Sequence, residues 1–274
     1  MAKLQARNIG KRFLSALGNE MHVVSAIENV NLTIEDEQFV CFVGPSGCGK
    51  TTFLNILAGL DKPTEGEIIL NGRPVTETGP DMVMVFQENA LFPWLKVIDN
   101  VEFGLKMKGV EKDKRREIAM RYLDMMQLDK FANAYIYQLS GGMKQRVAIA
   151  RALAIDPEVL LMDEPFAALD SQTRDLLLVE LQLIWARTKK TIVFITHNIL
   201  ESVVLGDKVV VFSKRPGSVK KEISVDYRRP RLPEDENLRP YYRQIIDAMK
   251  NEMLADKKDD DCGAGTSGGS SSSS

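Results

Sequence analysis

A glycine-rich run near the start of the chain carries the clearest chemical signal in the sequence. The run fits the pattern G-x-x-x-x-G-K-[ST], and its residues, with the threonine that follows, are Gly44, Pro45, Ser46, Gly47, Cys48, Gly49, Lys50, Thr51 and Thr52. Loops with this pattern surround phosphates with backbone N–H groups. The Lys50 ammonium can then bridge the outer phosphates, and the Thr51 hydroxyl can hold Mg²⁺. We therefore expect the chain to bind a nucleoside triphosphate.

The residues on either side of this run predict the elements that phosphate binding needs. Residues 38–43 form a short apolar stretch, which is typical of a buried strand. Residues 52–58 predict a helix that ends before Gly59. A strand that leads through glycines into a helix start directs backbone N–H groups and the helix dipole at an anion. A glycine-rich turn that matched the pattern by chance would lack this context.

Two adjacent carboxylates follow a second apolar stretch. Asp163 and Glu164 come directly after residues 159–162, which predict a strand. A carboxylate at the end of a strand beside a phosphate loop can hold Mg²⁺, and its neighbour can polarise a water that attacks the terminal phosphate. A solvated turn or a helix start would also place two acids together, but the phosphate loop upstream favours the catalytic interpretation.

A third motif, Ser140, Gly141 and Gly142, precedes an expected helix over residues 143–154. Serine is a good N-cap, and glycines permit a close approach of the backbone to a ligand. The motif could therefore be a second anion-binding helix start. A capped helix start without a ligand explains the same residues equally well, so the residues alone leave both interpretations open.

Residues 1–225 resemble an ATP-binding cassette (ABC) ATPase in six motifs that occur in the family's order. Residues 44–51 resemble its Walker A loop, residues 160–164 its Walker B strand and residues 139–145 its signature. Three further positions resemble the Q-loop glutamine, the D-loop aspartate and the switch histidine: Gln87, Asp170 and His197.

The resemblance implies an α/β P-loop NTPase fold with a RecA-like core, an antiparallel β subdomain and an inserted helical subdomain. It implies a head-to-tail homodimer with two ATP, each bound between residues 44–51 of one copy and residues 140–142 of the other. By the same resemblance, Glu164 is the general base, Asp163 and Thr51 bind Mg²⁺, Gln87 senses Mg²⁺ and water, and His197 contacts the γ-phosphate. For His197, the alternative is a buried structural histidine.

Two positions depart from the family pattern. Phe13 stands where the family often has a tyrosine that stacks on the base; it keeps the aromatic face, although it could equally be a packed core residue. Asn198 follows His197 where aspartate is common. Neither change removes the expected catalytic carboxylate, Glu164, so we expect an active ATPase.

Composition narrows the class of protein. The chain has 274 residues, of which 44% are hydrophobic and 27% charged, and its net charge is −2, so nothing favours nucleic acid as a partner. No stretch of about 20 apolar residues and no secretory signal is visible, so we expect a cytosolic protein. Three cysteines without metal-ligand spacing argue against a disulfide framework.

The organisation of the chain follows from hydrophobic periodicity. We expect an ATPase domain over residues 1–225 with a helical insertion at about 88–155, an extension over 226–255 with one helix at 241–254, and a disordered tail over 256–274. Strands that alternate with helices predict a mainly parallel sheet covered on both faces. Further segments typical of strands are residues 4–9, 23–27, 30–34, 66–70, 82–86, 191–195 and 208–212.

A cluster of large apolar residues directly follows Gln87 and ends at Leu95. It could dock a short helix of a partner or be buried in the chain's own core. The resemblance favours docking, because this region of ABC importers receives the membrane subunits. Residues 87–94, 213–217 and 225–231 are similar to those of the nitrate/sulfonate/taurine importer group, although Ser218, Tyr227 and Arg228 depart from its pattern.

This subgroup implies a subunit at the cytoplasmic face of the membrane that energises uptake of a small solute. Its implied partners are integral-membrane permease subunits and, indirectly, a solute-binding protein. Two alternatives remain: the ATPase of an exporter or lipid-trafficking system, and a soluble ABC ATPase that acts on nucleic acid.

Overall fold

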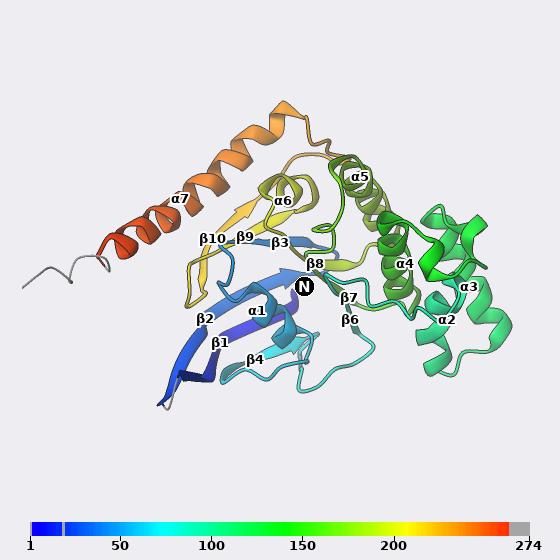
Figure 1. Ribbon diagram of the computed structural model, residues 1–274, viewed down its shortest axis with the longest axis horizontal. Helices are drawn as coiled ribbons and strands as arrows, with labels where there is room; N and C mark the ends of the chain where they lie inside the picture. Colours follow the sequence, from blue (N-terminus) through cyan, green and yellow to red (C-terminus); the bar gives the residue numbers. More distant parts are fainter. Residues whose placement is uncertain (1, 18–19, 263–274) are drawn as a thin grey trace, which may run out of the picture.

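Two β-sheets and a group of helices make up the fold (Figure 1). The structure is a computed structural model that describes residues 2–17 and 20–262. The larger sheet has six strands in the order β10-β9-β3-β8-β7-β6, and all neighbouring pairs are parallel except β9 and β10. These strands are β3 (Phe39–Val43), β6 (Met82–Val85), β7 (Val159–Asp163), β8 (Thr191–Ile195), β9 (Lys208–Phe212) and β10 (Val219–Ser224). The predicted, mainly parallel sheet is confirmed.

The three central strands of this sheet are buried at every position. Their sequences are almost continuously apolar because both faces of a parallel sheet are covered. On one face, Phe42 packs with residues of α1 (Lys50–Leu57) and of the second sheet; on the other, Phe39 packs with residues of α4 (Gly141–Ala154), α5 (Ser171–Thr188) and α6 (Ile199–Leu205).

The register of the central strands sets the position of the site. Phe42 of β3 and Asp163 of β7 both pair with Ile195 of β8, so these three residues lie on one line across the sheet. The carboxyl ends of parallel strands meet at one edge, so the segments that follow the three strands emerge side by side. These segments begin with the glycine-rich loop, with Glu164 and with Thr196.

The smaller sheet is antiparallel, in the order β2-β1-β4-β5. Its strands are β1 (Ala2–Leu17), β2 (Glu20–Glu35), β4 (Glu65–Leu70) and β5 (Arg73–Pro74). The expectation of two separate strands at 23–27 and 30–34 is wrong, because β2 continues through both. Asn29 has a φ of 46° and lies where the register against β1 shifts, so it forms a bulge instead of a turn.

The helices that separate β6 from β7 are α2 (Val97–Met107), α3 (Lys112–Met125) and α4, together with two short 3₁₀ turns, Asp129–Phe131 and Ile136–Gln138. Buried Asn100 of α2 holds the preceding loop: its side chain accepts a hydrogen bond from Phe92 N and donates to the carbonyls of Phe92 and Lys96. This segment corresponds to the expected helical insertion.

The chain ends in a long helix, α7 (Arg239–Cys262), preceded by a 3₁₀ turn at Glu236–Leu238 (Figure 1). The helix expected at 241–254 is therefore longer, and the expected disordered tail is helical up to Cys262. Pro240 lies in the first turn of the helix, where proline is tolerated, and no glycine or proline follows it before residue 263. The rest of that tail lies outside the described residues. Arg231, which is 1% exposed, fixes the start of the extension with hydrogen bonds to the carbonyls of Val203, Gly206, Val225 and Tyr227.

Candidate functional site

The glycine-rich loop connects β3 to α1 as the sequence predicts. Gly47 and Gly49 have φ values of 73° and 96°, in the left-handed region that favours glycine. A Cβ atom on Gly49 would lie 2.8 Å from the Ala26 carbonyl oxygen, so the loop also packs closely on β2. Phe53 N donates to Gly49 O at 2.8 Å and begins the hydrogen bonding of α1. The loop therefore leads directly into a helix start, as anion binding requires.

Lys50 is buried within this loop. Its side chain crosses the loop, and Nζ donates to the carbonyl oxygens of Gly44 and Pro45, both at 2.8 Å. The residue is 7% exposed, and the thiol of Cys48 lies 3.6 Å from Nζ. The loop thus encloses the Lys50 ammonium, which suits this group to bind phosphate oxygens.

Thr51 and Asp163 bring two oxygen donors together beside the loop. Thr51 Oγ1 donates to Asp163 Oδ1 at 3.3 Å. Burial raises the pKa of Asp163, while the Thr51 hydrogen bond opposes this shift. A hydroxyl and a carboxylate fit a hard cation such as Mg²⁺. Among the described residues, no group of three or more His, Cys, Asp and Glu side chains could hold a metal ion, so such a cation needs ligands from phosphate and water.

Glu164 and His197 form a contact at the same edge of the sheet. His197 Nδ1 lies 2.9 Å from Glu164 Oε2. The backbone N–H of Glu164 donates to Ile195 O at 3.0 Å, which ties the residue after β7 to the end of β8. The His197 side chain is 63% exposed, so the alternative of a buried structural histidine does not describe it.

A pocket of about 270 Å³ joins several of these groups. Its lining residues are Phe13, Ala26, Ser46, Gly47, Gly49, Lys50, Thr51, Thr52, Glu164 and Arg215. Phe13 is 40% exposed, so it is not a packed core residue, and its ring lines the pocket, where it can stack on a base.

Arg215 is a site residue that the sequence reasoning missed. Its loop lies against the glycine-rich loop: Gly217 N donates to Ala26 O at 2.9 Å, and a Cβ atom on Gly217 would lie 1.9 Å from Cys48 O. Only glycine fits at that approach. Residues 213–217 had been noted solely for their family resemblance, and no local pattern shows that they reach the pocket.

Ten predicted residues are not among those that line this pocket. Five of them contact lining residues as described above: Gly44, Pro45 and Cys48 contact Lys50, Asp163 contacts Thr51, and His197 contacts Glu164. The other five lie elsewhere. Ser140 and Asp170 are N-caps: Ser140 Oγ accepts from Met143 N at 3.3 Å, and Asp170 Oδ1 accepts from Thr173 N at 3.0 Å. A Cβ atom on Gly141 would lie 3.7 Å from Leu169, so the starts of α4 and α5 adjoin, and Gly142 is buried against Thr173. The exposed surface at Ser140 and Gly141 is thus separate from the Lys50 pocket.

Gln87 also lies outside the pocket. It is exposed and follows β6 at the edge of the sheet, next to β7 and Asp163. Beyond it, Trp94 is 71% exposed. The Phe92 ring lies 5.6 Å from that of Trp94 and 4.6 Å from that of Phe103. The predicted apolar cluster is therefore only partly buried in the chain's own core.

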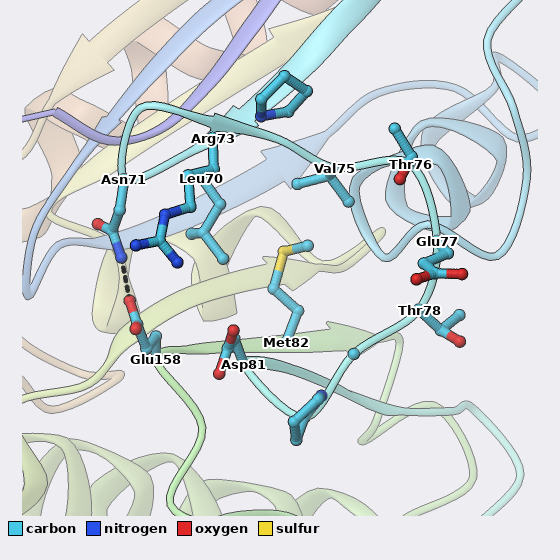
Figure 2. A pocket seen from close by; sticks show the side chains of 13 residues that line it. Leu70, Asn71, Arg73, Val75, Thr76, Glu77, Thr78, Asp81, Met82 and Glu158 are labelled. Atoms are coloured by element: carbon cyan, nitrogen blue, oxygen red, sulfur yellow. Dashed lines mark hydrogen bonds between the residues drawn. The ribbon is translucent and has the colours of Figure 1, made fainter.

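A larger pocket, of about 530 Å³, lies elsewhere, between the β4–β5 hairpin and the segment that leads into β6 (Figure 2). The Asn71 amide donates to the Glu158 carboxylate (Figure 2). Lys3 pairs with the same carboxylate at 2.7 Å. The hydrogen bond from Lys3 lowers the pKa of Glu158. None of the predicted chemical groups lines this pocket.

Comparison with known proteins shows which family the chain is similar to. The family model described as "ABC transporter" matches residues 27–167. An uncharacterised ABC transporter ATP-binding protein of Methanocaldococcus jannaschii is 49% identical over 93% of this chain and 94% of that protein. The nitrate import ATP-binding protein of Synechocystis is 47% identical over 85% of this chain and 84% of its own. The taurine import ATP-binding protein of Roseobacter denitrificans is 41% identical over 94% of this chain and 99% of that protein.

Solved structures confirm the predicted fold class. A dimeric ATP-binding cassette in a post-hydrolysis state, bound to ADP and Pi, matches with a TM-score of 0.71 and 36% identity over 82% of this chain and 100% of that one. In the part of the chain that the structure describes, no helix is long and apolar enough to cross a membrane.

Proposed function

This chain belongs to the family of ABC transporter ATP-binding proteins, and we propose that it is the ATP-hydrolysing subunit of a solute importer. The observation that carries the proposal is the contact of Glu164 with His197 at the pocket that Lys50 and Thr51 line. A phosphate-binding loop alone would support nucleotide binding. A carboxylate and an imidazole held together at its open side support hydrolysis as well.

In the proposed reaction, the loop N–H groups and the Lys50 ammonium bind the β- and γ-phosphates, and Phe13 stacks on the base. Glu164 orients a water molecule in line with the γ-phosphate and accepts its proton, while the bond to the β-phosphate oxygen breaks and yields ADP and inorganic phosphate. Thr51 and Asp163 would hold Mg²⁺, which would neutralise charge on the phosphates, and Gln87, at the end of β6, would contact this ion or its water.

The tautomer of His197 constrains its role. A neutral imidazole has one ring proton, and a contact with an ionised Glu164 places that proton on Nδ1. A hydrogen bond from His197 to a γ-phosphate oxygen therefore requires a second ring proton or release from Glu164. We infer that binding of the triphosphate separates the two side chains and frees Glu164 for the attacking water.

A head-to-tail homodimer accounts for the groups that lie outside the pocket. The starts of α4 and α5 adjoin each other and carry Ser140, Gly141, Gly142 and Asp170. In the proposed dimer, the surface at these helix starts in one copy closes over the nucleotide of the other. The dimeric cassette with ADP and Pi to which this chain is similar supports the proposal.

The permease would contact the segment from Gln87 to Leu95. Arg151 holds the backbone of this segment by donating to the carbonyls of Asn89 and Ala90 at 3.1 and 2.8 Å. Trp94 nevertheless remains exposed, beside an apolar pocket of about 230 Å³ that Phe92 helps to line. A rigid loop with an exposed tryptophan suits the docking of a partner helix.

The names of the relatives favour an importer of a small solute, such as nitrate, taurine or a sulfonate, over an exporter. Such a subunit would act at the cytoplasmic face of the membrane, bound to permease subunits. A solute-binding protein would deliver the solute to that permease. No observation favours the soluble ATPase that acts on nucleic acid.

The test combines turnover, dimerisation and partner capture. Glu164→Gln should abolish ATP hydrolysis, while ATP with Mg²⁺ still converts that variant to a dimer in size-exclusion chromatography. The wild-type chain should co-purify a multi-span permease from membranes of its own cells, and Trp94→Ala should lose the permease while retaining basal hydrolysis. Unchanged hydrolysis in Glu164→Gln would refute the assignment of the base, and capture of RNA or DNA without a permease would refute the transporter.

A further inference from the structure

A buried carboxylate of α6, Glu201, connects two loops of the site. The residue is 5% exposed, and its Oε2 accepts a hydrogen bond from Thr196 Oγ1 at 2.5 Å. Its other oxygen, Oε1, lies 3.5 Å from Arg174 Nε of α5. Burial raises the pKa of Glu201, whereas Thr196 and Arg174 oppose that shift. A buried ionisable group costs free energy unless neighbouring groups pair or hydrogen-bond with it. The two partners of Glu201 therefore indicate its role.

The first partner fixes the turn that carries His197. Thr196 N donates to Phe42 O at 3.2 Å, and Thr196 Oγ1 accepts from Asn198 N at 2.9 Å while donating its proton to Glu201. One hydroxyl thus joins the residues before and after His197, and Glu201 sets the orientation of that hydroxyl. The His197 side chain itself is exposed and contacts Glu164. Its position therefore depends on the turn beneath it.

The second partner fixes the loop that ends at Asp170. Arg174 Nη2 donates to Leu169 O at 2.8 Å, and Arg174 N donates to Asp170 O at 3.0 Å. The Nε atom of Arg174 is buried without a hydrogen-bond partner, because 3.5 Å to Glu201 is too long for a hydrogen bond. A displacement of a few tenths of an ångström at the Asp170 loop would convert this ion pair into a charge-assisted hydrogen bond.

We propose that Arg174 and Glu201 form a positioning relay that couples the Asp170 loop to His197. The relay rests on the proposed function, in which the Asp170 loop faces the second copy. When the two copies close, movement of that loop shortens the Arg174–Glu201 contact. Glu201 moves with Arg174 and changes the position of the Thr196 hydroxyl through their hydrogen bond. The switch turn is thereby held in the geometry in which His197 meets the γ-phosphate. Arg174 and Glu201 are positioning residues, since neither touches the nucleotide.

Glu201→Gln tests the relay without changing side-chain volume. We expect kcat for ATP to fall by about tenfold, equivalent to 1.36 kcal/mol in the barrier, with KM within about twofold of the wild type. The same substitution in a His197→Ala background should cause no further loss, because the relay acts only through His197. Arg174→Gln should behave in the same way, which provides a second variant if Glu201→Gln fails to fold.

The chain offers a matched control in Glu102. Glu102 is 9% exposed, and its Oε2 lies 3.6 Å from Arg115 Nε within the helical insertion. Glu102→Gln therefore removes a carboxylate of similar burial and pairing that lies outside the relay, and its kcat should remain that of the wild type.

Three outcomes would overturn the relay. One is a kcat for Glu201→Gln and Arg174→Gln equal to that of the Glu102→Gln control. A second is a further loss of full size in the His197→Ala background, because that shows a purely structural effect. A third is a lowered melting temperature with unchanged kcat. In each case, active wild type and inactive Glu164→Gln would leave the proposed ATPase function intact, so the two failures are distinguishable.

Discussion

Replacement of Arg231 by methionine should release the C-terminal extension from the ATPase core. The guanidinium makes five hydrogen bonds to four carbonyl oxygens: those of Val203 and Gly206 near the end of α6, and those of Val225 and Tyr227. Burial, followed by the neighbouring charge of Arg229, lowers the pKa of Arg231 to about 10, so the group stays charged at neutral pH. Methionine keeps most of the volume, so the variant reports on the hydrogen bonds.

The magnitude follows from the acceptors left behind. Each buried carbonyl that loses its donor costs about 1–3 kcal/mol, and four of them set an upper range of about 4–12 kcal/mol. Tyr227 is half-buried, so water can reach part of the site and lower the cost. We therefore expect a loss of about 3–5 kcal/mol, near the lower end of the range set by the unsatisfied carbonyls. This is a large fraction of the stability of an ordinary domain.

Urea unfolding and limited proteolysis would measure the effect. The free energy of unfolding should fall by the stated amount, and cleavage should appear between residues 226 and 238 while residues 2–225 stay protected. Arg228→Met is the matched control: Arg228 is an exposed arginine of the same segment, and its loss should change stability by less than about 0.5 kcal/mol. Equal stabilities for the two variants would refute the reasoning.

Two further predictions concern the nucleotide pocket. Phe13→Ala should weaken ATP binding by about five- to tenfold in calorimetry, whereas Phe13→Tyr should bind as the wild type does, because stacking needs only the aromatic face; equal affinities for Ala and Tyr would contradict this. Because burial raises the pKa of Asp163, its carboxylate takes up a proton at a higher pH than an ordinary aspartate, and the Mg²⁺ concentration for half-maximal hydrolysis should rise as the pH falls through the range just above the ordinary pKa of aspartate. The free folded protein binds this proton more tightly than the unfolded chain, so its stability should fall as the pH rises through this range, and thermal melts of Asp163→Asn should lack that component.

The sequence predicted the parts of the site whose signal is local. The loop from Gly44 to Thr51 and the acids after β7 were visible because short patterns of glycine, lysine and carboxylate follow apolar strands. The Asn71-Gly72 turn likewise forms the β4–β5 hairpin, with both residues at positive φ. In these cases, residues close in sequence set the structure themselves.

The features that sequence reasoning missed depend on contacts between distant segments. Arg231 lies in a Pro/Arg-rich stretch, a composition typical of a basic surface tail, yet it is buried because carbonyls at the end of α6 and in the segment after β10 surround it. Glu201 lies in a short helix, and no local pattern shows that it is buried between Thr196 and Arg174. The positive φ of Asn29 is typical of a turn, but β2 pairs with β1 on both sides of this residue, so the same conformation forms a bulge.

The line of residues Phe42, Ile195 and Asp163 across the central strands also bears on how the chain acquires activity. Each of the two pairings joins residues that are far apart in the sequence, and such non-local contacts form slowly because large loops must close first. The groups that bind and hydrolyse ATP are therefore assembled only when β3, β7 and β8 have all paired. In partly folded chains whose central strands have not all paired, Asp163 and Glu164 do not lie beside the glycine-rich loop. Recovery of Mg²⁺-dependent ATP binding during refolding should consequently report completion of the sheet, and ATP should shift the population towards the folded chain by mass action.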